Sequence, residues 1–206
     1  DAIWKIAIGA LKWNDLKRKY HLPLVFDWDE LTNIKGNSGP YIQYTYVRCH
    51  SVLMKAQNTV FSDLKPKENT VKNEQNMMDK TVNSGVSDKQ ESADIKRSIA
   101  DRFDTLLDNK EYFEYRPNAD EKDVLRNLYI YSDIIRSSAK EYAPHYISGY
   151  LYELAQSFNK FYGNNKVVDE ANDKKTTEFR LMLVQAVSLV LKHGLNILGI
   201  ETLEKM

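Results

Sequence analysis

The 206-residue sequence contains a single cysteine, no net formal charge and no long apolar run. One cysteine, Cys49, excludes an intramolecular disulfide framework and fits a reducing compartment. Twenty-nine basic and 29 acidic residues cancel, which argues against a purely electrostatic binder of nucleic acid but leaves room for a local patch. Because no apolar run approaches the roughly 18 residues of a membrane span, no membrane partner is expected.

Catalytic and metal-binding motifs are absent as well. The sequence has no glycine-rich phosphate loop, no Gly-x-Ser-x-Gly, and no Cys or His pair at metal-ligand spacing. The four histidines are scattered singly, and the acidic cluster at Asp27, Asp29 and Glu30 has neither a histidine nor a glycine-turned ligand loop. From the residues alone we expect no catalytic residue, no metal and no cofactor in this chain, which is typical of a binding or structural module.

Helical periodicity is what the sequence has instead, and no strand-period segment of any length accompanies it. Apolar stripes at helical spacing run over about 1–20, 41–56, 95–107, 124–135, 144–162 and 175–198. The last of these stripes nearly encircles its helix, so that helix should be the central and most buried one. The expected fold class is therefore all-α, a helical bundle.

Local signals predict where several of these helices begin and end. Asp27 should cap a short helical turn over 27–31, after an extended piece at 24–26. Pro144 should open a helix that Gly163 and the two asparagines after it end in the left-handed conformation. Gly199 should stop the last helix, after which residues 200–206 trail away. Residues 62–93 are too poor in apolar side chains to form a core of their own and indicate a polar insertion.

The stretch from Asn37 to Arg48 is the one around which the chain is organised. Asn37 or Ser38 should cap a helix that starts at the Gly-Pro turn. One side of this helix carries a core stripe, namely Ile42, Tyr46, Cys49, Leu53 and Ala56. The other side gathers rings and cations, namely Tyr41, Tyr44, Arg48 and Lys55. Rings and cations together suit a base and its phosphates, although the pattern alone favours an ordinary face with half-buried tyrosines and a salt bridge.

Three sets of residues, at 26–48, 144–162 and 191–206, together resemble arginyl-tRNA synthetases, a class I aminoacyl-tRNA synthetase family. Residues 26–30 and 36–48 are similar to the end of the family's catalytic region and the start of its DALR-type anticodon-binding domain. Pro144-His145, with the tyrosine, leucine and phenylalanine positions up to Tyr162, is similar to a later signature. The ending from Leu191 to Met206 is similar to the family's carboxyl terminus. The matches come in family order and cover nearly the whole chain outside 62–93.

The resemblance implies an enzyme that joins arginine to its tRNA using ATP and Mg²⁺ in the cytoplasm. The family's two ATP-binding signatures, of the His-x-Gly-His and Lys-Met-Ser-Lys-Ser types, do not occur here. Because the chain also starts without Met, we expect a piece cut from a longer protein, with the catalytic domain upstream. Residues 1–36 would then end the catalytic region, and 37–206 would be the anticodon-binding bundle. Such a piece should bind tRNA weakly and activate no arginine.

The resemblance also implies four anticodon contacts: Tyr44, Arg48, Tyr162 and Met206. In the family these positions surround the anticodon loop and its middle base, a cytosine. A ring and a thioether can sandwich a flipped base, and Arg48 can meet a phosphate or a base edge. One departure is Leu203, which stands where the family usually has Pro and implies a less fixed path for the tail.

Two other functions remain open at this point. The chain would be a free-standing helical tRNA-binding helper if it had lost its catalytic domain. It would be a helical protein-interaction module if it only mimics the family's pattern. Binding of tRNA separates the second from the rest.

Overall fold

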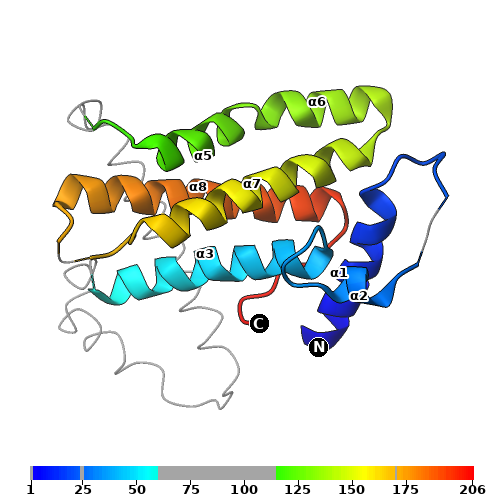
Figure 1. The fold of residues 1–206 in the computed structure, drawn as a ribbon, viewed down its shortest axis with the longest axis horizontal. Helices are drawn as coiled ribbons and strands as arrows, with labels where there is room; N and C mark the ends of the chain where they lie inside the picture. Colours follow the sequence, from blue (N-terminus) through cyan, green and yellow to red (C-terminus); the bar gives the residue numbers. More distant parts are fainter. Residues whose placement is uncertain (1, 24–25, 60–114, 170) are drawn as a thin grey trace, which may run out of the picture. The chain divides into compact units, whose positions relative to one another are not determined.

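The computed structural model of the chain describes residues 2–23, 26–59, 115–169 and 171–206. The described residues of 1–56 and 116–206 form one compact unit. The described helices are α1 (Ala2–Leu16), α2 (Trp28–Thr32), α3 (Gly39–Thr59), α5 (Ala119–Tyr129), α6 (Tyr131–Glu141), α7 (Pro144–Asn164) and α8 (Lys174–Ile197). These residues contain no strand, so the all-α fold class is confirmed (Figure 1).

Polar side chains define the starts of four helices. Asp27 and Ser38, both predicted as caps, accept hydrogen bonds from backbone N–H groups of α2 and α3 at 2.8 and 3.2 Å. Asn118 and Glu121 form a reciprocal capping box on α5, and Asp173 caps α8. Each cap of this kind contributes about 1 kcal/mol to helix stability. The sequence therefore determines these helix starts locally.

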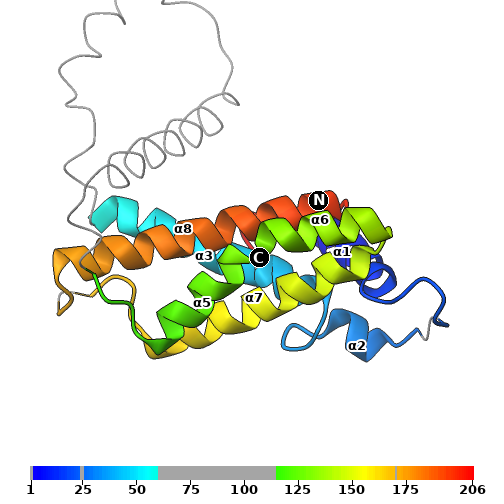
Figure 2. The ribbon, with the colours of Figure 1, turned by 90° about the horizontal axis from the view of Figure 1, so that it is seen from above.

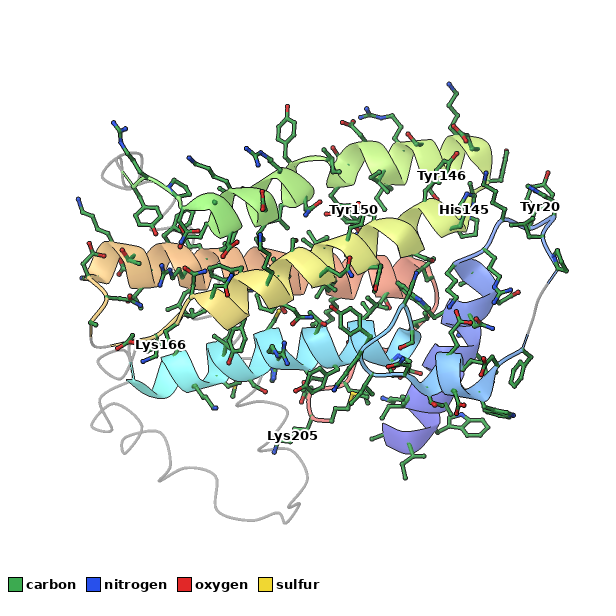
Figure 3. All side chains as sticks on the ribbon, viewed as in Figure 1. Tyr20, His145, Tyr146, Tyr150, Lys166 and Lys205 are labelled. Atoms are coloured by element: carbon green, nitrogen blue, oxygen red, sulfur yellow. The ribbon has the colours of Figure 1, made fainter. Side chains whose placement is uncertain are left out.

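Helix α7 packs against α1, α5, α6 and α8. Figures 1 and 2 both show α7 and α8 side by side. Tyr150 of α7 points toward the α5–α6 layer (Figure 3), where its ring stacks on Tyr131 and its hydroxyl donates to the Asn127 carbonyl at 2.9 Å. The apolar pattern of α8 predicts burial on nearly every side; ten of its residues are buried, but Leu189 is 57% exposed.

Two helix ends differ from the sequence prediction. The apolar stripe over 124–135 is shared by α5 and α6, which meet at Ile130. Helix α7 does not end in the left-handed conformation: Asn165 is extended, and its backbone and side-chain nitrogens both donate to the Phe161 carbonyl, at 2.9 and 3.0 Å. Asparagine tolerates the left-handed region, but here its side chain satisfies the helix end directly.

Helix α1 crosses the start of α3 at very close range. A Cβ on Gly39 would lie 2.4 Å from the backbone oxygen of Gly9, so only glycine fits this crossing. Trp13 is fully buried there, and its ring nitrogen donates to the Asn37 side chain at 2.9 Å. The predicted α1 stripe is buried only in part: Ala10 is 4% exposed, whereas Ile3 is 84% and Leu11 43% exposed. A helical apolar pattern predicts a helix, but it does not predict which other element covers each turn of that helix.

The tail after α8 packs against the bundle. Gly199 has φ +67°, and the Ile200 N–H donates to the Leu195 carbonyl at 2.9 Å, which closes the helix in a Schellman-type turn. Ile200 is 1% exposed and Leu203 is 6% exposed. The predictions that the tail trails away and that Leu203 leaves its path less fixed are therefore wrong, because both side chains anchor it in the apolar interior.

Several predicted features lie outside the described residues. They are the polar insertion at 62–93, the stripe over 95–107 and the first two residues of the extended piece at 24–26. Among the helices that are described, none is long and apolar enough to cross a membrane.

Candidate nucleic-acid interface

Helix α3 presents the two faces that its sequence predicts. Ile42, Cys49 and Ala56 are fully buried, and Tyr46 and Leu53 are nearly so. Burial raises the pKa of the Cys49 thiol well above its usual range, so the thiol stays neutral and works as a small apolar core residue. The core stripe therefore fixes the rotation of α3 about its axis, and that rotation turns Tyr44 and Arg48 toward the outside.

Arg48 lies between two exposed tyrosine rings. Its guanidinium carbon is 4.9 Å from the centre of the Tyr44 ring and 5.3 Å from the centre of the Tyr162 ring. A guanidinium Nη also donates to the Tyr44 hydroxyl at 3.3 Å. Both tyrosines are 38% exposed. The structure thus brings together three of the four predicted site residues, from helices more than one hundred positions apart, and leaves both rings accessible from solvent.

Asn159 of α7 holds this arrangement in place. Its side-chain oxygen accepts a hydrogen bond from Arg48, and its amide nitrogen donates to the Tyr41 hydroxyl at 2.9 Å and to the Thr45 hydroxyl at 3.1 Å. One amide therefore connects α7 to three side chains on successive turns of α3. We did not predict this role from the sequence; the available signal was a polar residue within the apolar stripe of α7.

Tyr162 is supported from its own helix. Its ring stacks on Phe158, with 6.1 Å between ring centres and 26° between planes, and Phe158 is fully buried. The ring is therefore backed by the core on one side and meets the Arg48 guanidinium on another. A cation over a tyrosine face contributes about 0.5–1 kcal/mol at an exposed site. These contacts restrict the ring before any ligand arrives.

Met206 ends a tail that follows the side of α3 on which Gln43 and Tyr46 lie. The Gln43 side chain donates to the Glu201 carbonyl at 2.8 Å and to the Lys5 carbonyl at 3.2 Å, which ties the tail and α1 to α3. Burial raises the pKa of Tyr46, a hydrogen bond with Thr202 opposes that rise, and the charge of Glu204 adds to it. In Figure 3 Lys205 lies below α3, whereas α7 lies above it.

Met206 itself is 46% exposed. Gln43 and Tyr46 fix the tail along α3, but the contacts in the described part of the chain do not join Met206 to the three residues around Arg48. The structure thus brings Tyr44, Arg48 and Tyr162 into one cluster, whereas the tail is held on the Gln43 and Tyr46 side of the same helix.

Comparison with known proteins gives a consistent family. The family model described as the DALR anticodon binding domain matches residues 88–206, more than half of the chain. The arginine–tRNA ligase of Halothermothrix orenii is 32% identical over 201 residues, covering 98% of this chain and 27% of that protein. That of Thermococcus kodakarensis is 29% identical over 201 residues, covering 98% and 25%. The chain thus spans about a quarter of the length of the curated relatives it matches.

Solved structures agree with this fold. The arginyl-tRNA synthetase of Thermus thermophilus aligns with a TM-score of 0.66 at 22% identity, over 98% of this chain and 27% of that one. The Plasmodium falciparum arginyl-tRNA synthetase aligns with a TM-score of 0.65, also at 22% identity, over the same shares. At such identity the likeness shows the fold, and the family model supplies the assignment: the chain belongs to the DALR anticodon binding domain family.

Proposed function

We propose that this chain is the anticodon-binding part of an arginine–tRNA ligase, and that Tyr44, Arg48, Tyr162 and Met206 contact the anticodon loop of arginine tRNA. The single observation that carries the site is the Arg48 guanidinium between two exposed rings, 4.9 and 5.3 Å from their centres. Single-stranded RNA loops are recognised by bases that leave the stack and lie on aromatic rings or guanidinium planes. A cluster in which both kinds of surface are already oriented suits that task.

Each of the four residues has a distinct part in this proposal. Tyr44 and Tyr162 offer ring faces to a base, and Arg48 sets the angle between the rings. Met206 offers a flexible thioether and backbone groups, and its carbonyl can accept a hydrogen bond from the exocyclic amine of cytosine. The middle anticodon base, a cytosine in the family, is the base assigned to this position.

The rest of the proposed reaction belongs to a longer protein. Joining arginine to tRNA requires ATP and Mg²⁺, and the described residues contain no group of three or more Cys, His, Asp or Glu side chains that could hold a metal. Because the chain spans about a quarter of the length of the relatives it matches, this proposal assigns ATP, Mg²⁺ and arginine to a catalytic domain elsewhere in the full-length protein. In the same proposal residues 1–36 end that catalytic region, residues 37–206 form the anticodon-binding bundle, and the protein works in the cytoplasm, where tRNA is charged for translation.

Substitution of Tyr44 by Ala, and separately deletion of Met206, should each weaken binding of an arginine tRNA transcript to this chain by about tenfold, because one base-stacking contact is worth about 1–3 kcal/mol. The dissociation constant is measured at low salt by fluorescence anisotropy. Circular dichroism should show unchanged helix content, since Tyr44 is 38% exposed and Met206 is 46% exposed.

The matched control is Tyr129→Ala, which removes a ring of the same kind that is 84% exposed at the end of α5. This variant should bind the transcript with wild-type affinity. Wild-type affinity in both the Tyr44 and the Met206 variants would instead overturn the site, and failure of the unsubstituted chain to bind tRNA would favour a protein-interaction module.

A further inference from the structure

A second cluster of ring and amide groups lies on α7 about two turns before Tyr162. Tyr152 is half-buried and meets the Tyr41 ring of α3 edge to face, with 5.7 Å between ring centres. Gln156 is exposed, and its amide nitrogen donates to the Tyr152 hydroxyl at 3.0 Å. The helical spacing of four residues places both side chains on one face of α7. This face borders α3, since Tyr152 contacts Tyr41.

The second cluster is continuous with the first through Asn159. The Asn159 amide holds Arg48 with its oxygen and the Tyr41 hydroxyl with its nitrogen, and Tyr41 is the ring that Tyr152 contacts. The Tyr41 hydroxyl is therefore hydrogen-bonded and its ring is packed, so Tyr41 separates the two clusters. Gln156 and Tyr162 are six residues apart, which is roughly 9 Å along the helix axis. One base cannot reach both, so a base bound at the second cluster would be a different one.

The chemistry of this occupant follows from the groups that are present. Gln156 has one amide hydrogen bond, to Tyr152, and within the described residues its side-chain oxygen has no protein partner. A carboxamide held in this way presents both a donor and an acceptor, the pair that reads a base edge. The Tyr152 hydroxyl accepts a hydrogen bond from the Gln156 amide nitrogen and so restricts the orientation of the amide. Because neither side chain carries a charge, the cluster suits a base better than a phosphate.

We propose that Tyr152 and Gln156 form a second base-binding position, which takes a base of the same RNA loop next to the one held at Tyr44 and Tyr162. The inference rests on the proposed function, because it assumes that the first cluster binds the loop. Gln156 selects the base through its edge, and Tyr152 is a positioning residue that orients the amide. The position widens the read-out of the loop beyond a single anticodon base.

The alternative is a surface pair within one helix, with no ligand. Such a pair adds little to stability, so both explanations predict that Gln156→Ala stays folded, and the distinction must come from RNA. The test uses this chain, an arginine tRNA transcript, and a series of transcripts in which each anticodon-loop base is replaced in turn by an abasic site.

Gln156→Ala should weaken binding of the intact transcript by about tenfold, the scale of one lost base-edge contact. At one loop position other than the middle anticodon base, replacing the base by an abasic site should weaken binding to the unsubstituted chain by a similar factor. The Gln156→Ala variant should bind that abasic transcript no more weakly than it binds the intact transcript. Tyr152→Phe, which removes only the hydroxyl that orients the amide, should show a partial loss at that same position. Gln185→Ala on α8 is the matched amide control and should bind like the unsubstituted chain.

The outcomes separate this inference from the function on which it rests. If Tyr44→Ala weakens tRNA binding but Gln156→Ala does not, the second base-binding position is wrong and the proposed function stands. The same conclusion follows if every abasic site lowers the affinity of the unsubstituted chain and of Gln156→Ala by the same factor. If Tyr44→Ala has no effect either, the proposed site fails and takes this inference with it.

Discussion

Replacing Arg180 by Met should lower the free energy of unfolding by about 3 kcal/mol, because it leaves a buried carboxylate without its cation. The Arg180 Nε donates to Glu121 at 2.8 Å, where the Glu121 side chain is 0% exposed and that of Arg180 is 12% exposed. The guanidinium also donates to the Lys166 carbonyl at 2.9 Å and to the Asn165 side chain at 3.3 Å. One side chain therefore joins the start of α5, the α7–α8 loop and α8. Urea denaturation followed by circular dichroism measures the change.

Arg126→Met is the matched control for this prediction. Arg126 pairs with Asp123 at 3.0 Å, but the two side chains are 75% and 44% exposed. An exposed pair contributes about 0–1 kcal/mol, so the control should change stability little. Adding Glu121→Gln to Arg180→Met should recover a large part of the loss, because glutamine keeps the capping bond to the Asn118 N–H and removes the stranded charge. Equal losses in the Arg180 and Arg126 variants would contradict the role of burial.

Replacing Arg48 by Ala should weaken tRNA binding by about tenfold or more, because it releases both tyrosine rings at once. Arg48→Lys should rescue little of this loss, although it keeps the charge. Lysine has no planar fork to donate to Asn159 and to stack on two rings. The dissociation constant of an arginine tRNA transcript is measured for both variants across a range of salt concentrations.

The salt dependence decides how Arg48 works. A cation that neutralises one phosphate of a single strand contributes about 0.7 to the slope of log affinity against log salt. Because Asn159 and the Tyr44 hydroxyl already engage the guanidinium, we expect Arg48→Ala to leave that slope nearly unchanged. A slope reduced by about 0.7 would assign Arg48 to a phosphate instead. Arg136→Ala on α6, with a side chain that is 79% exposed, is the control and should keep wild-type affinity.

The helix pattern was predictable from the sequence because its causes are local. The core stripe of α3 and the caps at Asp27 and Ser38 depend on residues within a few positions of one another. Pairing between distant segments was not predictable in the same way. An asparagine at position 159 carries no sign that it will bond to Arg48, 111 residues away. The resemblance to a family placed Tyr44, Arg48 and Tyr162 in one site; their periodicity alone did not.

The differences between the sequence predictions and the structure, in α8, α1 and the tail, have a common physical origin. The sequence pattern of α8 indicates burial on almost every side, yet Leu189 is 57% exposed. The pattern of α1 indicates a core stripe, yet Ile3 is 84% exposed. The tail looked unstructured because it has no period, whereas Leu203 packs into the interior at 6% exposure. In each case what covers a residue depends on packing between elements, which periodicity within one element does not encode.

The central claim is that this chain reads the anticodon of arginine tRNA. Its most direct test is the affinity of the chain for two transcripts that differ only in the middle anticodon base, cytosine in one and guanine in the other. We predict that the cytosine transcript binds at least about tenfold more tightly at low salt, because the wrong base loses both its edge contacts and its fit between the rings. Equal affinity for the two transcripts would contradict the account.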